Sequence, residues 1–232
     1  MRKEPYVVGS YVHIVKRGVR GMPIVRDEID QWRFLLLLRH LNNEQGIDNW
    51  FRDLIDENIA HTLERPKSWQ PQQKIVRILS FCLLDNHFHL LLKEIKKGGI
   101  STFMQKLGTS MANHFNEKYK EKGGLFQGAY RSKTIDTDEY LRYVSVYIQV
   151  KNAFEMYKGG TASALKDFDS AYAWAGKYPY SSLGDYAGMR DSPIIEKDIL
   201  GKIFSPEEYK VFSKEVMLNR TNFDTLSDTD LD

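Results

Sequence analysis

Apolar and polar residues alternate in a strand-like pattern in three stretches of the chain. Residues 6–16 are rich in β-branched and aromatic types and predict a first strand. Residues 75–94 contain two apolar runs joined by the polar pair Asp85-Asn86, and this arrangement predicts a β-hairpin. Residues 129–135 repeat the strand-like pattern and predict a fourth strand.

Helical spacing of apolar residues alternates with these stretches. It predicts helices over residues 27–42, 100–120 and 137–157, each with an apolar stripe that recurs every three or four positions. After Gly159-Gly160 the remainder is predicted to be loop-rich, apart from a short helix near 206–217.

The order of the predicted elements is β-α-β-β-α-β-α, which indicates an α+β fold. Such an order is typical of the ferredoxin-like, split βαβ arrangement, with a four- to five-stranded antiparallel sheet and helices on one face. The helix at 137–157 is an addition to that fold. We therefore expect a domain at residues 1–158 and a C-terminal extension at 159–232, whose last eleven residues carry four acids and are expected to fray.

Charge is distributed unevenly along the 232 residues, although the net charge is only +2. Residues 1–26 carry six basic residues against one acid, and residues 93–158 carry twelve against seven. Residues 185–232 carry six against eleven. A basic body with an acidic tail suggests an anionic partner for the body, although scattered solvated charge would give the same totals.

The remaining composition limits the cellular setting. Cys82 is the only cysteine, so the chain has no internal disulfide, and its apolar surroundings favour a packing role. No signal-peptide pattern opens the chain, and no apolar run approaches the length of a membrane span. We expect a cytoplasmic protein without a membrane partner.

His87 and His89 are the strongest indication of chemistry in the sequence. They lie at the start of the second hairpin strand, and side chains two residues apart on a strand point to the same face. Two imidazoles on one face can hold a divalent metal ion between them. Two half-exposed strand histidines without a metal would give the same pattern.

Tyr147 lies on the predicted helix that follows the last strand. Leu141, Val144 and Ile148 form the apolar stripe of this helix, and Tyr147 is about 60° from Val144 at its edge. The side chain can therefore pack partly and still present its hydroxyl at a cleft. A tyrosine at the border of an amphipathic helix, without a chemical role, fits the same spacing.

Four segments, in this order, resemble the single-tyrosine HUH transposases, also described as IS200-like transposases, and the resemblance extends from about residue 6 to 155. A fifth, later segment resembles the REP-associated tyrosine transposases. The segments are Tyr11–Gly18, Asp85–Leu92, Gly124–Lys133, Tyr140–Ile148 and Lys177–Ser182.

The resemblance implies a specific reaction. His87 and His89 would hold Mg²⁺ or Mn²⁺ against the scissile phosphate of single-stranded DNA. Tyr147 would attack the phosphorus, and the product would be a 5′-phosphotyrosine that a second strand end resolves, completing strand transfer. The enzyme would be a DNA nickase and strand transferase that needs no nucleotide cofactor.

The third metal ligand departs from the family pattern. The family usually has Gln or Asn four residues after the tyrosine, whereas this chain has Lys151, which cannot bind a metal as an ammonium. Asn152 lies about 140° from Tyr147 on a regular helix, and Gln149 about 160°. A π-bulge or a helix end near residue 150 would return Asn152 to the side of Tyr147. We therefore predict Asn152 as ligand, with Lys151 stabilising the phenolate or contacting phosphate.

Basic residues on or beside the predicted strands are candidates for phosphate contacts: Arg17, Arg20, Arg131 and Lys133. Three aromatic residues are candidates for base stacking, with core packing as the alternative for each: Phe126, Tyr130 and Trp174.

REP-associated relatives bind a DNA hairpin, so the resemblance implies a single-stranded DNA partner with a hairpin, and a monomer rather than a dimer. Two other functions remain open on the sequence alone. One is a related HUH nickase for replication initiation or conjugation, which the short chain disfavours. The other is a non-catalytic binder of single-stranded or hairpin nucleic acid on the same fold.

Overall fold

The computed structural model describes residues 6–219, and the predicted acidic end of the chain therefore lies outside the described residues. Four strands form one antiparallel sheet in the order β2-β3-β1-β4. Their bounds are β1 (Tyr11–Arg17), β2 (Val76–Leu83), β3 (His87–Glu94) and β4 (Arg131–Ile135). This strand order, with a helix between β1 and β2 and another between β3 and β4, confirms the ferredoxin-like arrangement.

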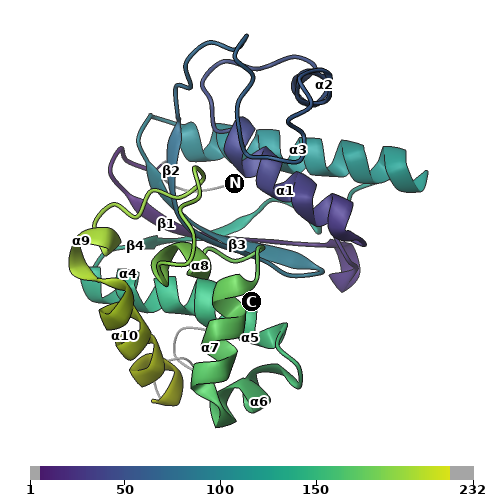
Figure 1. Cartoon of the computed structure of the whole chain (residues 1–232). Helices are drawn as coiled ribbons and strands as arrows, with labels where there is room; N and C mark the ends of the chain where they lie inside the picture. The colour runs from purple at the N-terminus through teal and green to yellow at the C-terminus, as the bar shows by residue number, and fades with distance from the viewer. Residues whose placement is uncertain (1–5, 220–232) are drawn as a thin grey trace.

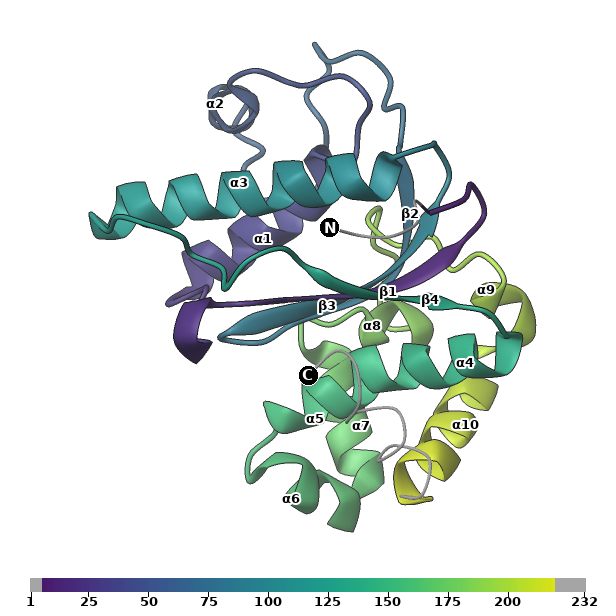
Figure 2. The same cartoon turned by 180° about the vertical axis from the view of Figure 1, so that it is seen from behind.

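Helices cover both faces of the sheet (Figures 1 and 2). One face carries α1 (Glu28–His40) and α3 (Gly99–Tyr119), with the short α2 (Trp50–Asp56) beyond them. The expectation of helices on one face is correct for α1 and α3, and the added helix with the C-terminal elements covers the other face. The elements of that second layer are α4 (Asp138–Val146), the π-helical turn η2 (Tyr147–Lys151), α5 (Asn152–Glu155), α6 (Gly160–Lys166), α7 (Phe168–Lys177), α8 (Leu183–Tyr186), α9 (Leu200–Ile203) and α10 (Pro206–Leu218).

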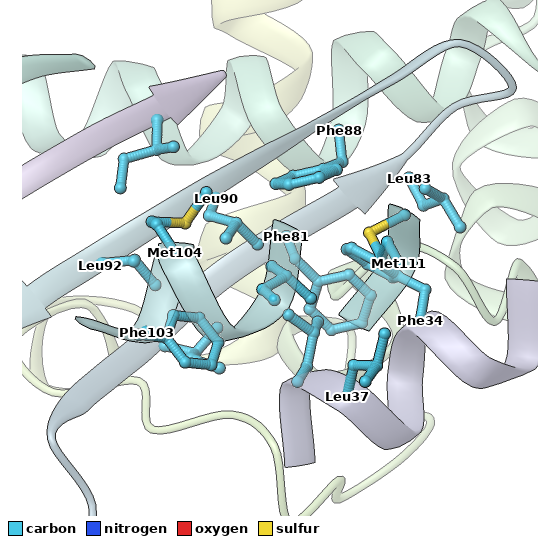
Figure 3. Close-up of a cluster of buried hydrophobic side chains, with 14 of the residues drawn as sticks. Phe34, Leu37, Phe81, Leu83, Phe88, Leu90, Leu92, Phe103, Met104 and Met111 are labelled. Carbon is cyan, nitrogen blue, oxygen red and sulfur yellow. The ribbon is translucent and has the colours of Figure 1, made fainter. Parts of the chain in front are cut away.

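Strand alternation divides the buried side chains between the two layers. Most of the buried strand residues that face α1 and α3 are apolar, and they pack with Phe34 and Phe103 of these helices (Figure 3). The strand residues of this core are Val12, Ile14, Val76, Ile78, Phe81, Leu83, Phe88, Leu90 and Leu92. Ile78 and Phe81 are three residues apart and would point to opposite faces of a regular strand. A register shift between Ile78 and Ser80 moves the alternation by one residue, so that both side chains reach the same core.

The C-terminal extension packs against the second face and against the edge of β2. Ser182 donates its backbone N–H to the Phe81 carbonyl, and Leu83 donates to the carbonyl of Tyr180, with an isolated bridge between Cys82 and Ser181. The extension shares one hydrophobic core with α4, as Tyr209 and Tyr186 show. The boundary at residue 158 stays a prediction.

The prediction of a loop-rich segment after Gly159-Gly160 is wrong for residues 160–177. Gly159 adopts a left-handed conformation with φ of 86° and ends one helical segment, but α6 starts at the next residue. Asp167 then caps α7 through its side chain, which accepts from the N–H of Ser170. The predicted helix near 206–217 is confirmed as α10, which begins with a Ser205 capping box. None of the helices within residues 6–219 has the length and apolar character to cross a membrane.

Candidate active site

The two histidines of the hairpin lie side by side on the face of the sheet that α4 covers. His87 is half-buried and His89 is buried, and their ring centroids are 5.0 Å apart. The Nδ1 of His87 lies 2.6 Å from Oδ1 of Asn86, an acceptor, so this nitrogen is the donor, and in a neutral ring Nε2 would keep its lone pair. Gly18 donates its N–H to the Asn86 carbonyl at 2.8 Å and ties the hairpin turn to β1.

A third histidine, His13 of β1, completes a buried cluster with this pair. Its Nε2 lies 3.0 Å from Nδ1 of His89, and the two rings stack with centroids 5.3 Å apart. In the register of β1 and β3, Val15 is opposite His89, so His13 is its diagonal neighbour on the same face. Burial, followed by the charges of His13 and His87, lowers the pKa of His89 well below its usual value and favours a neutral ring.

The phenol ring of Tyr147, at the end of α4, lies against this histidine cluster. Its ring lies edge-on to His89, with centroids 5.7 Å apart, and edge-on to His13 at 5.9 Å. Thr137 starts the helix that carries it by accepting a hydrogen bond from the N–H of Tyr140. The tyrosine is 5% exposed and belongs to the same chain as the histidines.

A π-helical turn follows immediately and changes the direction of the next side chains. The N–H of Asn152 donates to the Tyr147 carbonyl five residues back, as in a π-turn, instead of four residues back as in an α-helix. A π-turn places residues five apart one above the other, so Asn152 returns to the side of Tyr147. Asn152 is buried, and its Nδ2 has no hydrogen-bond partner among the described residues.

Lys151 lies over the ring of Tyr147, the candidate nucleophile. Its Nζ lies 4.8 Å from the centroid of the Tyr147 ring and pairs with Oε1 of Glu155 at 2.6 Å. The ammonium therefore lies where it favours a negative charge on the phenol oxygen.

Gln149, the other amide considered as a metal ligand, forms hydrogen bonds with the C-terminal extension. Its side chain accepts from Oγ of Ser182 at 2.6 Å and donates to the hydroxyl of Tyr209 at 2.6 Å. Ser181 donates its hydroxyl to the Gln149 carbonyl at 2.9 Å. These buried hydrogen bonds attach the π-turn to the C-terminal extension and direct Gln149 to the extension.

Basic side chains lie beside the histidines on the same face of the sheet. Arg17 is opposite His87 in the register, and it lines a pocket of about 230 Å³ together with Arg131 and the backbone around Gly128. Lys133 is opposite His13 and lies 5.2 Å from the ring centroid of Tyr140. Arg20 is exposed, at φ of 54° in the turn η1 (Val19–Gly21), beyond the end of β1. Three of the four predicted phosphate contacts thus share one face with the histidines.

The three aromatic candidates for base stacking lie in two parts of the fold. Phe126 lies edge-on to Phe88 and packs with Tyr130 against the core under α1 and α3, which is the core-packing alternative. Trp174 is partly buried and stacks on Tyr178 with ring centroids 5.4 Å apart.

His13 is the principal residue that the sequence interpretation missed. Its signal is a polar residue between Val12 and Ile14, in phase with Arg17 on an otherwise apolar strand. Within the described residues, no three His, Cys, Asp or Glu side chains form a group able to hold a metal ion. A metal between His87 and His89 would therefore need ligands of another kind, such as an amide, water or phosphate oxygen.

Two comparisons with known proteins gave a match. Residues 51–151, which include both hairpin histidines and Tyr147, match the family model described as transposase IS200-like. A solved structure of a REP-associated tyrosine transposase bound to a REP hairpin aligns with a TM-score of 0.44 and 12% identity, over 84% of this chain and 96% of the other. No curated protein matches the chain. Over residues 51–151 the chain is thus similar to the IS200-like transposases, the family that its motifs resemble.

Proposed function

We propose that the protein is a metal-dependent nickase and strand transferase for single-stranded DNA, with Tyr147 as the nucleophile. The observation that carries the proposal is the contact of the Tyr147 ring with His89, at 5.7 Å between centroids, beside the paired ring of His87. A phenol beside a pair of imidazoles supplies the nucleophile and the metal ligands that a metal-assisted phosphoryl transfer requires.

The residues present fit a divalent cation. Two imidazoles that share one cation must lie close together, and the centroids of the His87 and His89 rings are 5.0 Å apart, so these two residues would hold the cation. Asn152 adds an amide whose Nδ2 position lacks a partner, and rotation of the amide exchanges this nitrogen with the oxygen that Mg²⁺ or Mn²⁺ prefers. A bound Mg²⁺ or Mn²⁺ would polarise the scissile phosphate and neutralise its developing charge.

The covalent step exchanges one phosphodiester for another. The Oη of Tyr147 forms a bond to phosphorus and loses its proton, while the bond from phosphorus to the 3′-oxygen breaks and that oxygen takes up a proton. The DNA is left as a 5′-phosphotyrosine and a free 3′-hydroxyl. A second 3′-hydroxyl reverses the step, which restores the phenol and completes transfer without an external energy source.

Lys151 is proposed to assist the phenol. A phenol has an unperturbed pKa of about 10, so its ionisation near neutral pH needs a neighbouring positive charge. The Lys151 ammonium lies over the ring, and its pairing with Glu155 holds it at that position. This cation supports the proposal of a catalytic role at a position where relatives carry an amide.

The DNA is proposed to lie along the basic side chains beside the histidines, at the pocket that Arg17 and Arg131 line. Arg17, Arg131 and Lys133 provide positive charge beside the histidines, and Arg20 extends it beyond the end of β1. We propose a hairpin-bearing strand as substrate, a monomer as the active form, because Tyr147 reaches the histidines within one chain, and the cytoplasm as location.

The test is the formation of a denaturant-resistant protein–DNA adduct. Full-length protein is incubated with single strands that contain hairpins of varied sequence, with Mg²⁺, Mn²⁺ or EDTA. We expect an adduct that requires the metal and disappears in Tyr147→Phe. Tyr143→Phe is the matched control, because Tyr143 lies one turn earlier and packs against Phe212 instead of the histidines.

Three outcomes would contradict the proposal. An adduct that persists in Tyr147→Phe would assign the nucleophile to another residue. An adduct that forms equally well in EDTA would remove the role of the histidine pair as metal ligands. Binding of hairpin strands without any adduct would support a non-catalytic nucleic-acid-binding protein.

A further inference from the structure

We infer that His13 is a positioning residue, which fixes the tautomer of His89 so that Nε2 of His89 is available to a cation. The inference rests on the proposed function of the histidine pair, and it adds a residue outside the matched family segment to that site.

The contact is direct and shielded from water. Nε2 of His13 lies 3.0 Å from Nδ1 of His89, and the two side chains are 5% and 1% exposed. The ring planes are inclined by only 26° and the centroids are 5.3 Å apart, which suits a hydrogen bond that lies close to both ring planes. Water cannot easily replace this hydrogen bond at such a depth, so the bond couples the tautomer of His89 to that of His13.

Only one of the two facing nitrogens can carry the hydrogen. If it is Nδ1 of His89, that nitrogen donates to His13 and Nε2 keeps a lone pair for a cation. If it is Nε2 of His13, then Nδ1 of His89 accepts and Nε2 of a neutral His89 is protonated, which excludes coordination. A metal ligand normally donates its remaining ring N–H to an acceptor, and that acceptor commonly affects affinity by about 10–100-fold.

The two histidines of the hairpin use different acceptors for the same purpose. His87 donates its Nδ1 hydrogen to Oδ1 of Asn86, its neighbour in the chain. His89 points inward, where no side chain of the hairpin turn supplies an acceptor to its Nδ1, and the acceptor comes from β1 instead. The fold thus orients both rings through Nδ1, and the second acceptor depends on the β1–β3 register.

The test uses ¹⁵N chemical shifts of the histidine rings in metal-free, full-length protein, with His89 assigned through His89→Gln. His13→Leu removes the acceptor, while His13→Gln places an amide oxygen near the position of Nε2. We expect the Nδ1–H tautomer of His89 in the wild type and in His13→Gln, and loss of this bias in His13→Leu. The affinity for Mn²⁺, measured by electron paramagnetic resonance, should fall about 10–100-fold in His13→Leu and recover in His13→Gln.

The outcomes distinguish this inference from the proposed function. The inference is overturned if wild-type His89 carries its proton on Nε2, if His13→Leu leaves tautomer and Mn²⁺ affinity unchanged, or if the wild type does not bind Mn²⁺. If His13→Leu does not fold, His13→Asn replaces it, because its shorter amide cannot reach Nδ1 of His89. Tautomer control and Mn²⁺ binding without any DNA adduct would contradict the proposed function and leave the role of His13 intact.

Discussion

The two faces of the sheet differ in what they bury. Towards α1 and α3 the middle of the sheet buries apolar side chains, such as Phe88 and Leu90 (Figure 3), and the charged side chains of Lys16 and Glu94 on this face lie near strand ends. Towards α4 the same strands present His13 and His89 at 5% exposure or less. The neighbours Phe88 and His89 of β3 therefore belong to two environments, one apolar and one that contains polar groups.

The difference separates the tasks of the two layers. Burial of apolar surface stabilises the fold by about 25 cal/mol per Å², and a buried polar group adds little net stability even when it is hydrogen-bonded. Polar groups at the α4 face are therefore expected to contribute mainly position, and the opposite core to contribute mainly stability.

Phe88 and His89 allow the largest test of this contrast because they are neighbours on opposite faces. Phe88→Ala removes a fully buried ring that contacts Phe34 and Phe126, and we expect it to lower the free energy of unfolding by about 3–5 kcal/mol. His89→Leu is expected to cost less than half of that while it abolishes the DNA adduct. Urea titration and adduct yield per folded molecule measure the two effects.

The comparison fails if the two variants behave alike. A similar loss of stability in both would mean that His89 is chiefly a packing residue. Retention of adduct formation in His89→Leu would mean that the polar face does not carry the chemistry.

A smaller effect is expected for the hydrogen bonds that attach the π-turn to the C-terminal extension. Gln149→Leu leaves the hydroxyls of Ser182 and Tyr209 without this buried partner, and we expect a loss of about 1–3 kcal/mol. The adduct rate should also fall, because the π-turn carries Asn152 towards Tyr147. Ser213→Ala is the control: this buried hydroxyl has no partner among the described residues, so its removal should be neutral or stabilising.

The apolar face could be predicted from the sequence more completely than the polar one. Alternation along β1 and β3 suffices to place Phe88 and His89 on opposite faces, and the hairpin and helix α10 follow from local turn and capping residues. The family motifs add Tyr147, whose approach to His89 depends on packing between segments far apart in the chain.

The contacts that complete the site could not be predicted from local pattern. His13 meets His89 only through the β1–β3 register, which pairs residues 76 positions apart. The π-turn was one of two alternatives that would bring Asn152 to the side of Tyr147. The sequence could not decide between them, because a helical pattern with 3.6-residue spacing does not reveal a single five-residue turn. Helices α6 and α7 were missed because Gly159-Gly160 ends one helix without preventing the next from starting.

The pH dependence of stability tests a buried histidine on the other side of the sheet. His40, at the end of α1, lies against Trp50 and Trp69, and burial lowers its pKa to about 3. The unfolded chain, with a pKa near 6.5, therefore binds more protons between pH 6.5 and 3, and the free energy of unfolding falls as the pH falls through this window. We expect His40 to contribute about 1.4 kcal/mol to the loss of stability between pH 7.5 and 5.5.

Urea unfolding at both pH values, with His40→Leu and His40→Gln, measures this contribution. The two variants are expected to differ in absolute stability and to share the same reduced pH dependence, because neither side chain titrates. Wild-type pH dependence in both variants would show that His40 is not the group responsible.

The smallest effect is expected at the start of the helix that carries the nucleophile. Thr137 caps α4 through its side chain, and Thr137→Ala should lower the free energy of unfolding by about 1 kcal/mol, whereas Thr137→Ser keeps the acceptor and should change it little. Tyr147 lies more than two turns from this cap and is held by His13, His89 and Lys151, so the adduct rate per folded molecule should not change. A large fall in that rate with an intact fold would mean that the cap, rather than the contacts around Tyr147, sets the position of the phenol.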